Sequence, residues 1–328
     1  MKSAVTAWLV VALTLGAAPA RRAPHPVESM RISGVDYVRL ASWAYARKLD
    51  LRWARGTEAL LLSNPMARFT LVVDRRETRI NGVEVWLLFP VLMRNENVYV
   101  AQLDLQNTFL PILSPPKSRR GMKVRTVCLD PGHGGKDSGN RVGANQEKSY
   151  TLLLAQEVRQ QLVRQGIKVI LTRTTDAFIE LPGRPEVAAR RGADLFVSLH
   201  FNSAESSRDT VHGAEVYCLT PAGAPSTNAR GEGGSGGACP GNRFNDRNFF
   251  FAYQMQRAVT RFLGTEDRGL RRARFAVLRD AAMPAALIEA GFMSHPTEGQ
   301  RIFTAAYRQK MAEAIVEGVL AYKRQVEL

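Results

Sequence analysis

Two histidines and two glutamates lie where strands of this chain are expected to end or helices to begin. His133 follows the apolar stretch VCLD in the glycine-rich sequence PGHGG, His200 ends the run DLFVSLH, and Glu289 ends AALIE. Glu147 stands at the start of an expected helix, QEKSYTLLLAQEV. Ligands of parallel sheets bind beyond the carboxyl ends of the strands, so these four side chains are expected on one edge.

The four side chains have the composition of a hydrolytic zinc site. A catalytic zinc usually takes three protein ligands, often two histidines and a carboxylate, and leaves a fourth position for water. A further carboxylate that does not bind the metal can take the proton of the attacking water. Each residue alone has an ordinary interpretation, such as Glu147 as a charge stabilised by the helix dipole. The coincidence of all four on one edge favours a metal site.

The elements that must position these residues follow from hydrophobic periodicity over 122–328. Continuous apolar strands alternate with amphipathic helices, which indicates an α/β fold with a mostly parallel twisted sheet and helices on both faces. Strands are expected at VRTVCLD, IKVILTR, DLFVSLH, GAEVYCLT and AALIEAGF. Helices are expected at SYTLLLAQEVRQQLVRQG, RPEVAARRG, NFFFAYQMQRAVTRFLG and TAAYRQKMAEAIVEGVLAYKRQ. Residues 122–328 are therefore expected to form the catalytic domain.

Residues 30–113 have a shorter, mixed pattern that predicts a small α+β accessory module. YVRLASWAYARKLDL predicts one helix, and ALLLSN, RFTLVVDRRETRINGVEVWLLF and NVYVAQLDL predict strands. The Asn81-Gly82 pair is a strong hairpin signal. The sequence ING followed by an apolar strand resembles the small domain that accompanies copper amine oxidases. SPPKSRRG, 114–121, is expected to be a linker.

The N-terminus and the charge bear on where the protein acts. Residues 1–20 have the basic start, apolar run and small residues of a secretory signal peptide, followed by a basic leader at 21–29. Neither that run nor any later stretch is long enough for stable membrane insertion. The expected location is therefore outside the cytoplasm, in the periplasm or cell envelope. Export opposes a nucleic-acid partner, so the net charge of +15 suits an anionic wall polymer.

The cysteines and the clustered arginines offer less chemistry. Cys128, Cys218 and Cys239 lack the spacing of a zinc knuckle, but Cys218 and Cys239 could pair in an oxidising compartment. The arginines of the segment DRGLRRAR are expected on a solvated face, where they could contact anionic polymers. They are Arg271, Arg272 and Arg274.

The second half of the chain resembles the zinc-dependent N-acetylmuramoyl-L-alanine amidases. The resemblance rests on LDPGHGGKDSG, QEKSYTLLLAQEV, LTRTTD, LPGRPEVAARRGADLFVSLHFNSA, GAEVY and DRGLRRARFAVLRDAAMPAALIEAGFMSHPTEG, in this order. It implies that His133, Glu147 and His200 bind Zn²⁺. It also implies that Glu289 is the general base. The implied substrate is peptidoglycan, cut at the amide between N-acetylmuramic acid and L-alanine.

Further site residues and rival functions stay open at this point. Asn202 could contact substrate or orient the site, and His212 could line the cleft or serve as a plain loop residue. Some members of the family carry an inhibitory helix that an activator protein displaces. The insert at 221–246 is too glycine-rich for a stable helix, so a flexible loop beside the substrate is expected there. The rival functions are a zinc peptidase that cuts within the stem peptide and a non-catalytic wall-binding protein.

Overall fold

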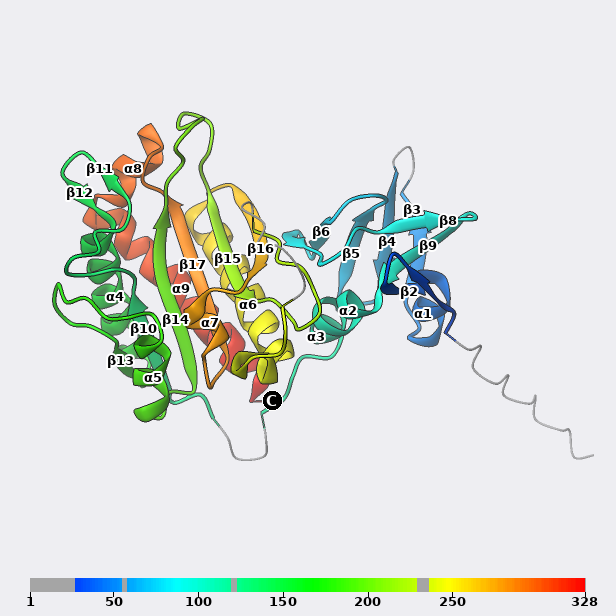
Figure 1. Ribbon diagram of the computed structural model, residues 1–328, viewed down its shortest axis with the longest axis horizontal. Helices are drawn as coiled ribbons and strands as arrows, with labels where there is room; N and C mark the ends of the chain where they lie inside the picture. Colours follow the sequence, from blue (N-terminus) through cyan, green and yellow to red (C-terminus); the bar gives the residue numbers. More distant parts are fainter. Residues whose placement is uncertain (1–26, 55–57, 119–122, 229–235, 328) are drawn as a thin grey trace, which may run out of the picture.

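The computed structural model describes residues 27–54, 58–118, 123–228 and 236–327. A large α/β unit lies beside a smaller, β-rich accessory module, defined by residues 30–113 (Figure 1). The predicted signal peptide and most of the basic leader lie outside the described residues. None of the helices in the described part of the chain has the length and apolar character of a membrane span.

The accessory module is built mainly from short strands. Its elements are β1 (Ser29–Ile32), β2 (Val35–Arg39), α1 (Leu40–Ala46), β3 (Asp50–Trp53), β4 (Ala59–Ser63), β5 (Arg68–Val72), β6 (Glu77–Ile80), β7 (Val83–Trp86), β8 (Leu92–Arg94), β9 (Asn97–Ala101), α2 (Gln102–Asp104), the π-helical turn η1 (Leu105–Phe109) and α3 (Leu110–Leu113).

The larger unit alternates strands and helices, as its apolar periodicity predicts. Its elements are β10 (Thr126–Pro131), β11 (Arg141–Val142), β12 (Asn145–Gln146), α4 (Glu147–Arg164), β13 (Lys168–Leu171), α5 (Gly183–Arg190), β14 (Leu195–Asn202), β15 (Ala214–Leu219), the 3-10 turn η2 (Pro240–Phe244), α6 (Asn245–Leu263), β16 (Asp267–Ala273), α7 (Ala276–Arg279), β17 (Ala285–Phe292), α8 (Pro296–Ile302) and α9 (Ala305–Val326). The strand β16 was not predicted, because its three arginines interrupt the apolar pattern.

One sheet of the described residues runs through both parts of the chain, in the order β13-β10-β14-β17-β15-β16-β7-β6-β5-β4-β3. The strands β13, β10, β14 and β17 are parallel to one another, whereas β15 runs antiparallel to β17. The accessory module joins at β7, which lies parallel to β16 where Val85 pairs with Leu270. The predicted α/β class is confirmed. The domain boundary at 114–121 remains a prediction. The large sheet contains strands from both sides of it in the sequence.

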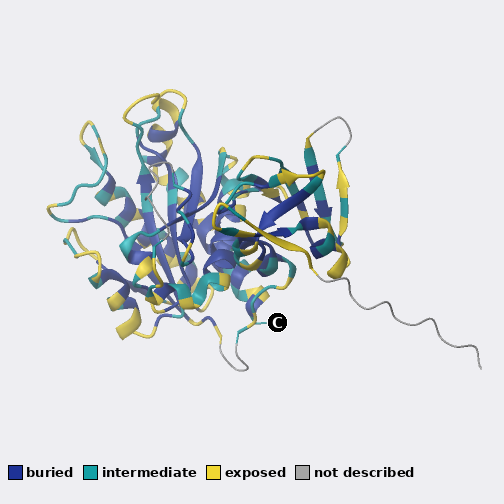
Figure 2. Ribbon diagram, turned by 45° about the vertical axis from the view of Figure 1, so that its right-hand side comes forward, coloured by how far each residue is buried: buried dark blue, intermediate teal, exposed yellow. Residues whose placement is uncertain are grey.

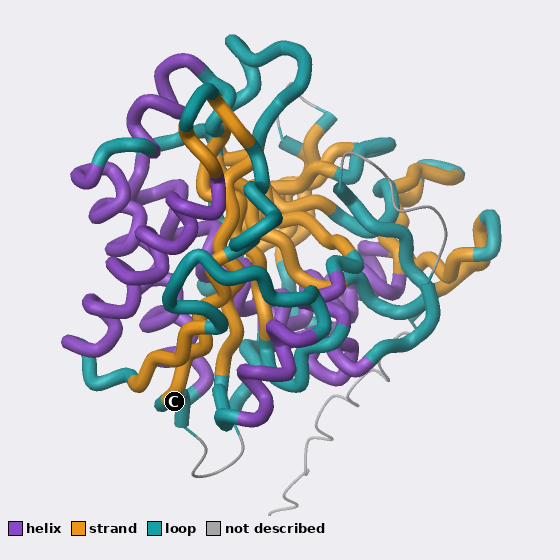
Figure 3. The backbone as a smooth tube through the Cα atoms, turned by 60° about the vertical axis from the view of Figure 1, so that its left-hand side comes forward, coloured by secondary structure: helices purple, strands orange, loops and turns teal. Residues whose placement is uncertain are grey.

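Helices cover both faces of the sheet in the larger unit (Figures 1 and 3). Successive side chains of a strand point to opposite faces, so Val127 and Leu129 join the apolar cluster under α4, α6 and α9. Cys128, between them, joins the cluster under α5 and α7. Figure 2 shows the central strands as the most buried part of the molecule. The first cluster continues without a break into the accessory module.

Of two expectations about the accessory module, one needs correction and the other is confirmed. The stretch 37–51 forms the end of β2, the short helix α1 and the start of β3, and not one helix. Val38 pairs with Val100 of β9, and Lys48 adopts a left-handed φ of 56° that is incompatible with a continuing helix. The hairpin at Asn81-Gly82 is confirmed, with φ values of 50° and 87° that its tight turn requires.

The cysteines are free thiols, so the suggested pairing of Cys218 with Cys239 is absent. Cys218 is buried in β15, where its sulfur lies 3.6 Å from Nη1 of Arg272. Cys239 instead donates to Oδ1 of Asn242 in η2. The two sulfurs thus have separate polar partners.

Candidate metal and catalytic site

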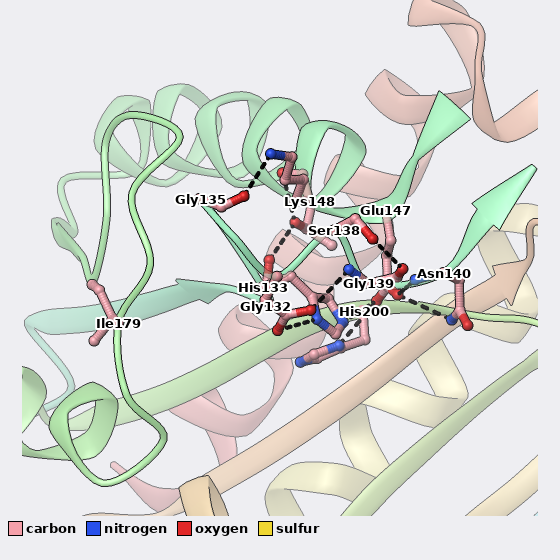
Figure 4. A network of polar contacts seen from close by, with 12 residues as sticks. Gly132, His133, Gly135, Ser138, Gly139, Asn140, Glu147, Lys148, Ile179 and His200 are labelled. Carbon is pink, nitrogen blue, oxygen red and sulfur yellow. Dashed lines mark hydrogen bonds and ion pairs between the residues drawn. The ribbon is translucent and has the colours of Figure 1, made fainter. Parts of the chain in front are cut away.

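The three residues expected to bind a metal converge at one edge of the sheet (Figure 4). His133 lies in the loop after β10, His200 lies near the end of β14, and Glu147 is the first residue of α4. Oε1 of Glu147 is 3.0 Å from Nε2 of His133 and 3.0 Å from Nδ1 of His200. The potential ligand atoms all lie within 4.8 Å of one another. Folding therefore brings together residues that are far apart in the sequence.

The loop that carries His133 is held by buried polar side chains that sequence reasoning missed. His133 adopts a left-handed φ of 62°, which is uncommon outside glycine and costs backbone strain. Nη2 of Arg184 donates to the carbonyl of His133, and Nη1 donates to Oδ1 of the buried Asp130, both at 3.0 Å. Nη2 of Arg173 donates to the Gly132 carbonyl at 2.8 Å. These contacts fix the strained turn.

Asp137 orients the imidazole of His133. Its Oδ2 lies 2.8 Å from Nδ1 of His133, and its Oδ1 accepts from the Gly139 N–H at 3.0 Å. A carboxylate on one ring nitrogen sets the tautomer and leaves the other nitrogen free to bind a metal. In the sequence, the only signal for this role is that the acid lies four positions after the histidine.

Two glycines leave room for the side chains of His200 and Glu147. A Cβ atom at Gly132 would lie 2.3 Å from Cε1 of His200. A Cβ atom at Gly139 would lie 2.6 Å from Oε2 of Glu147, and the φ of Gly139 is +61°. Both distances are shorter than side chains tolerate, so the close approach of the ligands depends on glycine at these positions.

The electrostatics around Glu147 suit a cation. Burial alone would raise the pKa of Glu147, but hydrogen bonds from His133 and His200 outweigh it and hold the pKa well below its usual range. Burial lowers the pKa of His133, yet the hydrogen bond and charge of Glu147 raise it overall. A buried anionic carboxylate between two imidazoles is a donor set that zinc prefers. The residues present therefore fit a divalent metal.

Glu289 lies on β17 directly beside the group formed by His133, Glu147 and His200. Its backbone pairs with His200 of β14 on one side and with Glu215 of β15 on the other. Oε2 of Glu289 is shielded from solvent and has no hydrogen-bond partner among the described residues. Burial, together with the charges of Glu147 and Glu215, raises the pKa of Glu289 well above its ordinary value. A shielded carboxyl beside a metal site can hold and release a proton.

A second polar cluster, which the sequence did not reveal, forms the wall beside Glu289. Glu215 is buried, and its Oε1 accepts from Nδ2 of Asn202 at 2.9 Å and from the hydroxyl of Tyr217 at 2.8 Å. Its Oε2 lies 3.1 Å from Nε of Arg271 and 3.5 Å from Nε of Arg268. We call Glu215, Asn202, Tyr217 and Arg271 the Glu215 cluster.

The arginines of DRGLRRAR do not form the expected solvated face. Arg271 is 8% exposed and Arg272 is 1% exposed, because β16 is an interior strand of the sheet. Arg272 donates to the carbonyl of Asn107 and the hydroxyl of Thr108 in the accessory module. Arg274 donates to carbonyl groups of the insert, including those of Pro221 and Ala224.

The ligands, Glu289 and the Glu215 cluster line a common cleft with a cavity volume of about 520 Å³. Asn202 lies in its wall, but His212 is not among the lining residues. The ring of His212 instead packs on His295, and its Nε2 lies 3.4 Å from Oε2 of Glu266. The structure thus brings Asn202 to the site and leaves His212 outside it.

The described ends of the insert 221–246 are held in place. The N–H of Thr227 donates to the Arg272 carbonyl at 2.8 Å, and its hydroxyl accepts from the Arg272 N–H at 2.7 Å. Asn228 lines the cleft. The expectation of a flexible loop covers the whole insert. Residues 229–235 lie outside the described residues, whereas Pro240–Phe244 form the 3-10 turn η2.

Known proteins share both the sequence and the fold of the larger unit. Residues 127–321 match a family model described as N-acetylmuramoyl-L-alanine amidase. AmiA of Escherichia coli K12, an N-acetylmuramoyl-L-alanine amidase, is 34% identical over 233 residues, which are 64% of this chain and 80% of that protein. Among solved structures, the amidase AmiC2 of Nostoc punctiforme is 34% identical with a TM-score of 0.52, and the match covers 62% of this chain and 99% of that chain. An amidase of Clostridium difficile 630 matches with 33% identity and a TM-score of 0.51, over 61% and 97% of the two chains.

Proposed function

Because this chain belongs to the N-acetylmuramoyl-L-alanine amidase family, we propose that its cleft hydrolyses peptidoglycan with a zinc ion held by His133, Glu147 and His200. The observation that carries the proposal is the pair of 3.0 Å contacts that place two imidazoles on one carboxylate oxygen. Zinc in such a site supplies Lewis acidity and lowers the pKa of water. Two histidines and one carboxylate suit zinc better than magnesium or calcium, which prefer oxygen ligands.

In the proposed reaction, Glu289 moves the proton. Its carboxylate takes a proton from water as the water oxygen bonds to the lactyl carbonyl carbon of N-acetylmuramic acid. The bond from that carbon to the L-alanine nitrogen then breaks, and Glu289 returns the proton to the leaving amine. The shielded position of Oε2 supports this role, because no described group competes for its proton. Asn202, in the wall of the same cleft, is proposed to contact the substrate.

The reaction is proposed to take place outside the cytoplasm, in the periplasm or cell envelope. The support is the signal-peptide pattern at 1–20 together with the substrate class of the family, since peptidoglycan lies beyond the cytoplasmic membrane. The positive net charge of +15 also favours an anionic wall over a cationic partner.

Digestion of purified peptidoglycan sacculi by the mature protein tests this function. Mass spectrometry is expected to find released stem peptides with a free L-alanine N-terminus, and release is expected to stop with a chelator and to return with zinc. Fragments cut inside the stem peptide would overturn the proposal in favour of a zinc peptidase. Binding to sacculi without any release, in the presence of zinc and of cell-envelope extract as a source of an activator protein, would indicate a wall-binding protein.

A further inference from the structure

The accessory module and the cleft meet at the end of β7. Val85 of β7 pairs with Leu270 of β16, and the apolar core continues from one part into the other. An independent binding module would need only a linker and a small contact surface. Here the strands of the module extend the sheet that carries the Glu215 cluster.

Trp86, the last residue of β7, lies against Arg271 of β16. The guanidinium carbon is 4.1 Å from the centroid of the indole ring, in the geometry of a cation–π contact. Gly269 makes this approach possible, since a Cβ atom there would lie 2.9 Å from Cδ1 of Trp86. The Nε1 atom of Trp86 has no hydrogen-bond partner in the described chain. The polar contact of this side chain is therefore the one between the face of its ring and Arg271.

Arg271 transmits this contact to the cleft. Its Nε lies 3.1 Å from Oε2 of Glu215, and its Nη1 donates to the Thr227 carbonyl at 3.1 Å. Glu215 in turn holds the amide of Asn202 and lies opposite Glu289 on the neighbouring strand. Two consecutive contacts therefore connect the accessory module to Glu215, which pairs with the proposed base, and a third connects Glu215 to Asn202.

We infer that the accessory module is a structural part of the hydrolytic cleft, with Trp86 as a positioning residue that acts through Arg271 on Glu215 and Asn202. The inference rests on the proposed function only in taking this cleft as the site of reaction. An arginine side chain has many rotamers, and a buried carboxylate needs its countercharge in a fixed place. The indole face restricts Arg271 to the rotamer that meets Glu215.

A second contact between the module and the larger unit supplies a matched control. The hydroxyl of Tyr253 on α6 donates to the Ile80 carbonyl at 3.2 Å and lies 3.4 Å from Nδ2 of Asn81. Neither contact involves the cleft. Y253F therefore weakens the junction without touching Arg271, whereas W86A removes the ring and W86F keeps an aromatic face.

Hydrogen exchange and kinetics on the full-length mature protein with zinc test the inference. We expect W86A to speed exchange in 214–219 and 226–228, with W86F close to the wild type and Y253F unchanged there. We expect W86A to lower kcat/KM by roughly 30-fold, the factor that corresponds to the free energy of a desolvated cation–π contact. The loss should fall mainly on KM, because the metal ligands are not displaced, and zinc content should stay constant.

A double variant separates positioning from general destabilisation. If Trp86 acts through Glu215, adding W86A to E215Q lowers kcat/KM no further than E215Q alone. Additive losses, or equal exchange rates in W86A and Y253F, would overturn the inference. Hydrogen exchange does not depend on turnover. An inactive wild-type protein would therefore contradict the proposed function, while the positioning role of Trp86 could still be tested by exchange. If W86A does not fold, W86L tests the same role, because leucine keeps apolar volume but has no aromatic face for Arg271.

Discussion

His133 and Asp137 are joined by a 2.8 Å hydrogen bond between Nδ1 and Oδ2, which turns the other ring nitrogen of His133 toward Glu147. The acid lies four residues after the histidine in a loop that also contains Gly134, Gly135 and Gly139. One short segment thus carries both a proposed ligand and the carboxylate that orients it.

Removal of this orienting carboxylate should weaken metal binding. We expect D137A to lower zinc affinity by roughly 10- to 100-fold, the usual cost of losing such a partner. D137N should lose less, because its amide oxygen can still accept from the ring. Competition with a chromogenic chelator measures the affinity. D176A is the control, since Asp176 contacts the same loop through the Gly135 N–H and not through the imidazole; an equal loss in D176A would mean that loop anchoring is the cause.

Loss of the proposed base should separate metal binding from turnover. We expect E289Q to keep its zinc and to lower kcat by roughly 10²- to 10⁴-fold, the range for a missing acid–base group. Metal analysis and release from sacculi measure the two properties on one sample. E313Q, at an exposed position of α9, controls for the removal of a carboxylate elsewhere. Near-normal turnover of E289Q would exclude Glu289 as the proton carrier.

Two glycines with similar backbone angles offer a test of the space around the ligands. Gly139 has a φ of +61° and lies against Glu147 and His133, whereas Gly143 has a φ of +59° and nothing within 4 Å of an added Cβ. Backbone strain should cost G139A and G143A about 1 kcal/mol of stability each, and G139A should lose more because its methyl group also clashes with Glu147. Only G139A should also lose zinc affinity, because its methyl group displaces Glu147. Equal affinities in a calorimetric titration would contradict this view of the loop.

Asp104 should make stability depend on pH. It is fully buried in the accessory module, where it accepts from the N–H groups of Leu88 and Phe89. Burial outweighs these hydrogen bonds and raises the pKa of Asp104 from 3.8 to about 6. The folded pKa lies above the unfolded one, so the protonated form stabilises the fold below pH 3.8 and this contribution disappears as the pH rises through about 6.

The expected size of this effect is on the order of 3 kcal/mol between pH 4 and pH 6. Denaturant unfolding across that window measures it, with D104N as the control, because asparagine does not titrate. Subtraction of the two curves isolates Asp104 from all other groups. If the free energy of unfolding changes with pH in the same way in the wild type and in D104N, Asp104 has an ordinary pKa.

The sequence by itself determined the α/β class of residues 122–328 and the family, and it predicted that His133, Glu147, His200 and Glu289 lie on one edge of the sheet. These follow from local signals, namely apolar periodicity, glycine-rich turns and motif order, all of which are readable along one segment. The hairpin at Asn81-Gly82 belongs to the same category, since two adjacent residues carry its geometry.

Only the tertiary structure decided how the accessory module relates to the cleft. The pairing of β7 with β16 joins Val85 to Leu270, 185 positions further along the chain (270 − 85), and no local signal in either segment identified the partner. The same holds for the burial of Arg271 and Arg272, which charge alone would place in solvent, and for Glu215, which gains its role from Asn202 and Arg271. Such contacts depend on the complementarity of distant surfaces, and that complementarity exists only once both surfaces have folded.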